Sequence, residues 1–166
     1  TRAPEAGAAR TYGNLIGGRS VPSPTSFASR SSSRLSDVVG YFPEATKEQV
    51  REACQVAREA FRTWSRTPAP IRGQVIGQLG KALEREKESL SRLVTREMGK
   101  TLKEARGSVQ EAIDTCHFFQ SEGRRLYGQT VPSEMPRKEL ATYRRPLGVV
   151  GIVTAGNFPI AVPSWK

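Results

Sequence analysis

The chain has 166 residues, of which 37% are hydrophobic, and its 26 Lys and Arg against 16 Asp and Glu give a net charge of +10. This length fits one domain or a piece of a larger protein, and the apolar content excludes a wholly disordered chain. The excess charge is spread evenly, with +3 over residues 1–42, +3 over 43–134 and +4 over 135–166, so we expect no nucleic-acid partner.

The N-terminal part shows short extended segments separated by turn-forming residues. Apolar residues followed by Gly17-Gly18 predict a short strand over residues 12–19 that runs into a turn. Residues 20–36 contain eight Ser and two Pro, which predicts an irregular surface segment. Residues 37–42 are rich in Val and aromatic side chains and are predicted to form a second short strand.

The middle of the chain is amphipathic at helical spacing and predicts four helices, over residues 46–66, 71–84, 86–98 and 101–124. Two of them begin with capping boxes, Thr46-x-x-Gln49 and Thr101-x-x-Glu104. Gly99 follows the third helix in the position of a C-terminal cap. We expect these helices to form one layer.

The C-terminal part changes to extended patterns. Residues 140–145 alternate as an exposed strand would, and the β-branched run over residues 147–153 predicts a strand buried on both faces of a parallel sheet. A polar loop follows, and Pro159 is suited to the first turn of a helix that runs to Lys166.

Asn157 lies in that loop, after a predicted strand and before a helix, where α/β proteins place ligands. Its side-chain amide is an uncharged donor that can stabilise an oxyanion without titrating. The simpler interpretation of Asn157 is a turn residue.

The residues around Asn157 resemble the aldehyde dehydrogenase superfamily. Three motifs of that family occur in order: a Pro-x-Gly-Val-x-Gly strand from Pro146 to Gly151, the loop Asn157-Phe158-Pro159, and Trp165-Lys166. Upstream, Glu97-Met98-Gly99-Lys100 is similar to the family's Glu-x-Gly-Lys turn. The similarity extends over about residues 12–166 and is weakest in the Ser-rich segment.

The resemblance implies an α/β fold, the N-terminal part of an aldehyde dehydrogenase-like fold with a helical layer beside the first strands of a Rossmann-like parallel sheet. Residues 1–42 would be an N-terminal extension, and residues 43–136 the helical part of the cofactor-binding domain. Residues 137–146 would be a strand of an oligomerisation arm, and residues 147–166 the start of the Rossmann-like NAD(P)-binding core.

The implied reaction is oxidation of an aldehyde to a carboxylic acid through a cysteine thiohemiacetal, with NAD or NADP as cofactor. Asn157 matches the family's oxyanion-hole Asn. Lys166 matches a lysine close to the site, and its other interpretation is a solvated cation. The segment that lines the dinucleotide cleft is matched by the backbone of Val153, Thr154, Ala155 and Gly156.

Two details bear on the substrate. Thr154-Ala155 is similar to branches of the family that act on semialdehydes. Gly156 stands where many members carry an aromatic residue, so the shape of the substrate tunnel is left open.

In the family, the nucleophilic Cys, the general-base Glu and the Gly-rich turn at the pyrophosphate follow the stretch that ends at Lys166. We therefore expect an N-terminal fragment that is inactive alone, with a small-molecule aldehyde as substrate and a homo-oligomer as the full-length assembly. The alternative is a non-catalytic helical interaction module that retains the family's outline.

The remaining reactive side chains have structural interpretations. Cys54 and Cys116 lie on apolar helical faces without metal-ligand spacing, and are predicted to be small buried hydrophobes. His117 is predicted to lie at a helix surface or core margin. We expect no metal site and no membrane partner. Two cysteines suggest no disulfide framework, so we expect a soluble, cytoplasmic protein.

Overall fold

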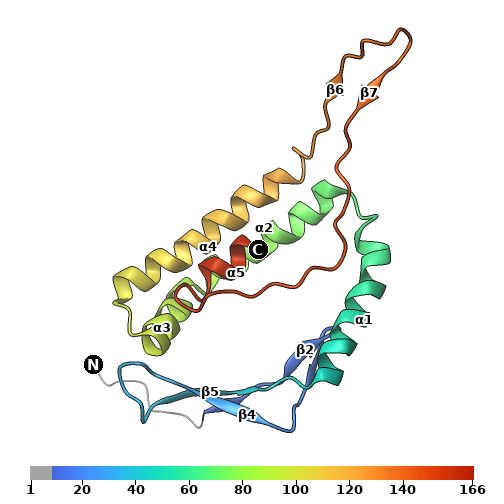
Figure 1. Cartoon of the computed structure of the whole chain (residues 1–166). Coiled ribbons are helices and arrows are strands. Elements are labelled where there is room, and N and C mark those ends of the chain that lie inside the picture. The colour runs from blue at the N-terminus through green and yellow to red at the C-terminus, as the bar shows by residue number, and fades with distance from the viewer. Residues whose placement is uncertain (1–8) are drawn as a thin grey trace.

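The computed structural model describes residues 9–166, which form an elongated molecule (Figure 1). Short strands lie at one end, long helices lie beside one another in the middle, and a hairpin projects from the other end. Helix α1 connects the strands to the other helices. The chain is thus a mixed α/β structure, as the sequence predicts.

The N-terminal strands form two small sheets. β1 (Arg10–Thr11) pairs in parallel with β5 (Val38–Pro43), and β5 pairs antiparallel with β4 (Ser26–Arg30). β2 (Asn14–Ile16) and β3 (Arg19–Val21) form a hairpin. The turn of this hairpin is Gly17-Gly18, and both of its residues have positive φ. The predicted strands over residues 12–19 and 37–42 are confirmed in outline.

The prediction that residues 20–36 are irregular is wrong for β4. Phe27 is the large apolar side chain of this strand, which otherwise consists of Ser, Ala and Arg, and its ring lies 6.0 Å from the ring of Phe42 on β5. Strand formation here comes from hydrogen bonding to β5 and from this cross-strand aromatic contact, which local composition does not reveal.

The four long helices match the predicted ranges within two residues at each end. They are α1 (Lys47–Trp64), α2 (Ala69–Arg85), α3 (Lys87–Met98) and α4 (Leu102–Glu122). Both capping boxes are formed, with the Oγ1 of Thr46 and of Thr101 accepting the backbone N–H three residues later. Gly99 ends α3 with a φ of 73°, a left-handed conformation that favours glycine.

The core lies where α2, α3 and α4 pack together. Helix α4 contributes most of the buried side chains, which are Ala105, Ser108, Val109, Ala112, Ile113 and Cys116. Helix α2 faces α4 with its glycines, and the side chain of Cys116 lies 3.0 Å from where a Cβ of Gly80 would be. These glycines lower helix propensity, but they allow the two helices to approach closely.

Helix α1 differs from the others because none of its residues is buried. It is joined to the N-terminal hairpin by a hydrogen bond from Asn14 Nδ2 to Gln49 Oε1, 3.2 Å long. The prediction that Cys54 is buried is wrong, since its side chain is exposed. Amphipathic spacing identified the helix correctly, but no described element covers its apolar face fully, and Val50 and Trp64 are about half exposed on it.

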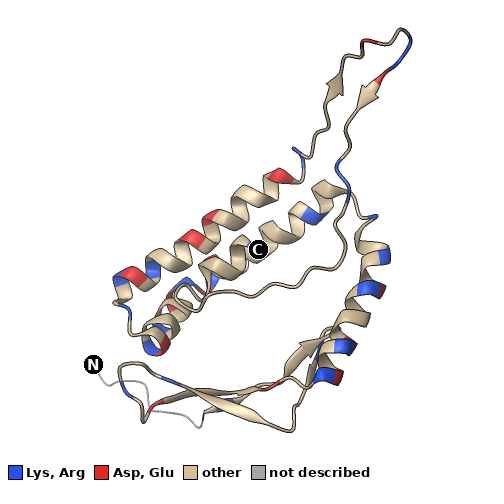
Figure 2. Cartoon of the chain, viewed as in Figure 1, with Lys and Arg blue, Asp and Glu red and all other residues tan. Residues whose placement is uncertain are grey.

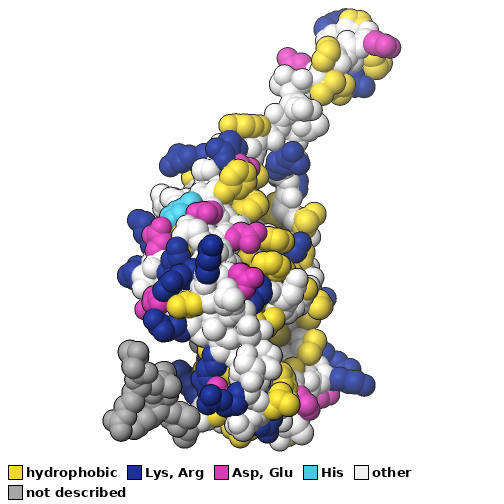
Figure 3. Space-filling model, turned by 90° about the vertical axis from the view of Figure 1, so that its left-hand side faces the viewer, with side chains coloured by type: hydrophobic (Ala, Val, Ile, Leu, Met, Phe, Trp, Pro, Cys, Tyr) yellow, Lys and Arg dark blue, Asp and Glu magenta, His cyan; other side chains and the backbone are white. Residues whose placement is uncertain are grey.

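The projecting hairpin consists of β6 (Thr130–Val131) and β7 (Leu140–Ala141), which pair antiparallel. The predicted strand over residues 140–145 is confirmed only for its first two residues. Apolar side chains of the hairpin are exposed, including Met135 near its tip, and Figure 3 shows hydrophobic side chains among charged ones there.

The prediction of a buried strand over residues 147–153 is wrong in this structure. The segment forms no strand and bends at Val149, and Leu147 and Val153 are 95% and 99% exposed. A strand buried in a parallel sheet needs hydrogen-bonded neighbours on both sides, and no described strand lies beside this segment. The four helices therefore do not pack beside such a strand.

Figure 2 shows Lys and Arg interleaved with Asp and Glu along the helices. The ion pairs include Arg106 with Glu88 between α4 and α3, at 2.9 Å. None of the described helices has the length and apolar character needed to cross a membrane.

Candidate active site

The predicted cofactor-binding segment, Val153 to Gly156, is exposed along its length; it has no regular secondary structure, and Gly156 begins a turn. Its backbone is therefore accessible to a ligand. A Cβ at Gly156 would meet no heavy atom within 4 Å, so packing within the described residues does not require glycine at this position. The segment fits a role in which backbone groups, rather than side chains, contact a dinucleotide.

Asn157 follows this segment in a turn that leads into the short helix α5 (Ala161–Trp165). The side chain of Asn157 is exposed, so its amide is accessible to a reacting molecule. The turn is tied to the helix because the backbone N–H of Val162 donates to the carbonyl oxygen of Phe158, at 3.1 Å. The geometry is compatible with an oxyanion donor and with a turn-forming residue.

Phe158 is held from a different part of the chain. The Nζ of Lys100, in the turn between α3 and α4, lies 3.7 Å from the centroid of the Phe158 ring. Both residues belong to motifs of the sequence, but those motifs do not predict this contact. Cation–π pairs leave no periodic signal in a sequence, so only the fold could reveal it.

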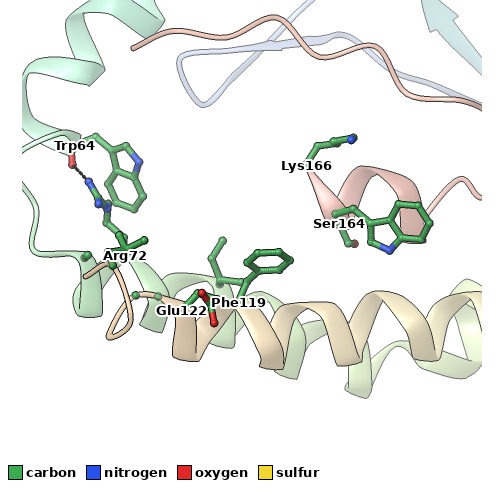
Figure 4. Close-up of a pocket in the computed structure, with 12 residues that line it drawn as sticks. Trp64, Arg72, Phe119, Glu122, Ser164 and Lys166 are labelled. Atoms are coloured by element: carbon green, nitrogen blue, oxygen red, sulfur yellow. Dashed lines mark hydrogen bonds between the residues drawn. The ribbon is translucent and has the colours of Figure 1, made fainter. Parts of the chain in front are cut away.

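Lys166 lies in a different place from Asn157. It follows α5 and lines a pocket of about 360 Å³ that is bordered by the end of α1, by α2 and by α4. Figure 4 shows Lys166 across this pocket from Trp64 and Arg72, with Phe119 between them. Asn157 is not one of the described residues that line this pocket. The structure therefore does not bring the two predicted catalytic residues into one pocket.

Two of the charged side chains that line the pocket, those of Arg72 and Glu122, have partners within the chain. Arg72 Nη1 donates to the backbone oxygen of Trp64 at 3.5 Å, and Glu122 pairs with Arg125 at 2.6 Å. The remaining walls are largely aromatic and aliphatic, from Phe119, Leu126 and Trp165 among others. The pocket is thus a largely apolar groove that charged groups also line, and no cysteine is among the described residues that line it.

The cysteines and His117 lie far from Asn157 in the sequence. Cys116 is buried between α4 and α2, and burial raises the pKa of its thiol, which disfavours a nucleophilic thiolate. His117 is exposed, and its Nε2 lies 3.0 Å from Glu84 Oε1 between α4 and α2. Of the two places predicted for it, a helix surface or a core margin, the structure has the helix surface. Residues 9–166 contain no group of three or more His, Cys, Asp or Glu arranged to hold a metal ion.

The sequence matches the family model described as "Aldehyde dehydrogenase family" over residues 22–166. The match covers most of the chain, including the turn at Lys100 and the segment from Val153 to Lys166. The chain therefore belongs to the aldehyde dehydrogenase family.

Individual relatives agree with this assignment. "Aldehyde dehydrogenase family 7 member A1" of Pisum sativum is 43% identical over 129 residues, which is 78% of this chain and 25% of the relative. "Alpha-ketoglutaric semialdehyde dehydrogenase" of Bacillus subtilis (strain 168) is 36% identical over 158 residues, or 94% of this chain and 32% of the relative.

A solved structure gives the same result for the fold. The NAD-dependent aldehyde dehydrogenase from Sinorhizobium meliloti superposes with a TM-score of 0.86 and 31% identity, over 93% of this chain and 31% of that one. The present chain spans about a quarter to a third of the length of the relatives that it matches.

Proposed function

We propose that this chain is the N-terminal part of an NAD(P)-dependent aldehyde dehydrogenase that oxidises an aldehyde to a carboxylic acid. The observation that carries the proposal is the accessible Asn157 amide, directly after the exposed backbone of Val153 to Gly156, in a chain that belongs to the family. A donor placed next to a ligand-binding backbone is what an oxyanion hole requires.

In this proposal the chain supplies binding and electrostatic stabilisation. The side-chain N–H of Asn157 donates to the aldehyde oxygen as it becomes an oxyanion, when a cysteine thiolate attacks the carbonyl carbon to form a thiohemiacetal. The backbone of Val153, Thr154, Ala155 and Gly156 would hold NAD or NADP, which would supply the acceptor for the hydride that the substrate loses. Lys166 is proposed to lie close to the reaction, in the proton relay.

Neither cysteine of this chain suits the nucleophile's role. Cys116 is buried with a raised pKa, and Cys54 lies on α1, more than a hundred positions from Asn157 in the sequence. We therefore propose that the 166 residues are catalytically silent by themselves and that the thiolate comes from another part of the whole protein.

We further propose that the substrate is a semialdehyde. The proposal is supported by Thr154-Ala155 and by the α-ketoglutaric semialdehyde dehydrogenase of B. subtilis among the relatives. The projecting hairpin with its exposed apolar side chains supports residues 137–146 as an arm that contacts another subunit of a homo-oligomer. The other proposed divisions, 1–42, 43–136 and 147–166, and the cytoplasmic location stay predictions.

The alternative, a non-catalytic interaction module, is favoured by one observation. Helix α1 is amphipathic, yet none of its residues is buried, so its apolar face is free to bind a partner protein. In this alternative, the role of Asn157 would be limited to forming the turn before α5.

An assay of the whole protein distinguishes these functions. Purified protein is mixed with NAD or NADP and with a panel of aldehydes that includes dicarboxylic semialdehydes, and formation of reduced cofactor and of the acid is followed. We expect turnover by the whole protein and none by the 166-residue chain. Absence of turnover with every aldehyde and both cofactors would argue for the interaction module.

A further inference from the structure

The turn between α3 and α4 carries the Glu-x-Gly-Lys motif, for which the proposed reaction assigns no role. Gly99 is required in this turn by its positive φ. A Cβ there would also crowd the N-terminal segment, because it would lie 2.7 Å from the Oγ of Ser32 and 3.0 Å from the Oγ of Ser33. The N-terminal Ser-rich segment thus packs directly against the turn.

Hydrogen bonds fix the turn on both sides. The Oγ of Ser29 donates to Glu97 Oε1 at 2.9 Å, and the backbone N–H of Ser32 donates to the carbonyl oxygen of Glu97 at 3.2 Å. On the other side, Thr101 and Glu104 form the capping box of α4. Lys100 therefore extends from a backbone that is held before and after it.

From this fixed base, Lys100 reaches the residue next to Asn157. Its ammonium lies 3.7 Å from the centre of the Phe158 ring, Lys100 is half-buried, and Phe158 is 36% exposed. Cation–π attraction grows as the pair loses water. The carbonyl oxygen of Phe158 also accepts the hydrogen bond from the backbone N–H of Val162 at the start of α5. A contact that fixes the Phe158 ring therefore also restricts the backbone of the turn.

We propose that Lys100 is a positioning residue, which fixes the Asn157 turn through the face of the Phe158 ring. The N-terminal strands hold the α3–α4 turn in place through hydrogen bonds. Lys100 connects this turn to the Asn157 loop through its contact with the Phe158 ring. The effect on turnover rests on the proposed function, because it requires Asn157 to be the oxyanion donor. The effect on the conformation of the turn does not.

The conformational test is hydrogen–deuterium exchange in the whole protein, read by mass spectrometry on peptides that cover residues 154–164. Lys100→Met keeps the length of the side chain and removes its charge, whereas Lys100→Arg keeps a cation that can lie over the ring. Lys103→Met is the matched control, because Lys103 is exposed on the first turn of α4.

We expect exchange in residues 154–164 to rise by about three- to thirtyfold in Lys100→Met, and to stay near the wild-type rate in Lys100→Arg and Lys103→Met. Exchange in α4 should not change in any of the three. Unchanged exchange in Lys100→Met, or an equal rise in Lys103→Met, would overturn the proposal. A rise spread over α3 and α4 would also overturn it, because that result means general destabilisation.

Kinetics of the same variants test the consequence for the reaction. Lys100→Met should lower kcat by a similar factor, leave the KM for NAD or NADP nearly unchanged, and be rescued in Lys100→Arg. If the turn loosens but kcat does not fall, Lys100 has no part in positioning for catalysis. If the wild-type whole protein oxidises no aldehyde, the proposed function fails, while exchange still decides whether Lys100 holds the turn.

Discussion

The guanidinium of Arg96 on α3 makes two hydrogen bonds to the carboxylate of Asp37, from Nε to Oδ2 at 2.9 Å and from Nη2 to Oδ1 at 2.6 Å. The same Nη2 also donates to the backbone oxygen of Val38 at 3.0 Å. Bidentate pairs of this kind are stronger and more directional than single ion pairs. This pair fastens the start of β5 to the helices, and so joins the N-terminal strands to the support of the Lys100 turn.

The pair makes stability depend on pH. The hydrogen bonds from Arg96, and its charge, hold the pKa of Asp37 below its usual value. A carboxyl whose folded pKa is lowered adds stability above its unfolded pKa, about 3.9, and loses it as the pH falls through the folded pKa. We expect Asp37→Asn to lower the urea midpoint at pH 7, and the difference from wild type to shrink as the pH falls below about 4.

A matched control is Glu48→Gln. Glu48 pairs with Arg51 at 3.4 Å, with both side chains largely exposed, and exposed pairs contribute little to stability. Its urea midpoint should remain near that of the wild type at both pH values. An Asp37→Asn variant as stable as wild type at pH 7 would show that the Arg96 pair does not hold β5 to α3.

The buried glycines of α2 provide a second prediction. A Cβ at Gly73 would collide with the backbone oxygen of Gln120 on α4, and a backbone atom cannot move aside as a side chain can. We expect Gly73→Ala to destabilise the protein by about 1 to 3 kcal/mol, because overpacking forces the helices apart. The measurement is the free energy of unfolding in urea.

Gly107 on α4 is the control for helix propensity. It is exposed, and a Cβ there would meet no heavy atom within 4 Å. Gly107→Ala should therefore stabilise the protein by about 0.5 to 1 kcal/mol. If both glycine variants were stabilised alike, α2 and α4 would not be packed as closely as described.

The two cysteines should differ sharply in reactivity. Cys54 is exposed on α1, whereas Cys116 is buried and its thiol pKa is raised, and the thiolate is the reactive form. We expect a thiol reagent to label Cys54 in the folded protein and Cys116 only after denaturant is added. Mapping of the labelled peptides by mass spectrometry gives the answer, and Cys54→Ser should remove the native-state label from α1. Rapid labelling of Cys116 without denaturant would contradict the buried position between α2 and α4.

Local signals explain what the sequence predicted well. The starts of α1 and α4 depend on capping boxes whose partners are three residues apart, and the end of α3 depends on Gly99. Each of these is readable without knowing the fold. The Asn157 loop was found in the same way, from the order of breakers, a polar residue and a helix start.

Long-range contacts explain what the sequence did not predict. β4 depends on β5, the glycines of α2 depend on α4, and Lys100 depends on a ring 58 positions later in the sequence. The β-branched run predicts burial of residues 147–153, but burial requires neighbouring strands, and these residues have none among the described elements. Cys54 is exposed for the same reason, because no described element covers the apolar face of α1 fully.

The last prediction concerns Asn157 in the whole protein, and it rests on the proposed function. If the amide donates to the developing oxyanion, Asn157→Ala removes a donor that acts most strongly in the transition state. The turnover rate should then fall by roughly a hundred- to a thousandfold, about 2.7 to 4 kcal/mol. Asn157→Asp should be no better, because a carboxylate repels the same oxygen. The affinity for NAD or NADP should change little, since backbone groups make the proposed cofactor contacts.

The competing account, in which Asn157 only forms the turn, predicts the opposite pair of results. The turn position and the hydrogen bond from Val162 to Phe158 make Asn157 suited to such a role, so Asn157→Ala would lower the melting temperature and leave turnover per folded molecule nearly intact. Turnover and melting temperature are therefore measured on the same preparations of wild type, Asn157→Ala and Asn157→Asp. A large loss of turnover at an unchanged melting temperature supports the oxyanion donor. Near-normal turnover in Asn157→Ala removes this residue from the mechanism, since no other change in that variant could replace the missing donor.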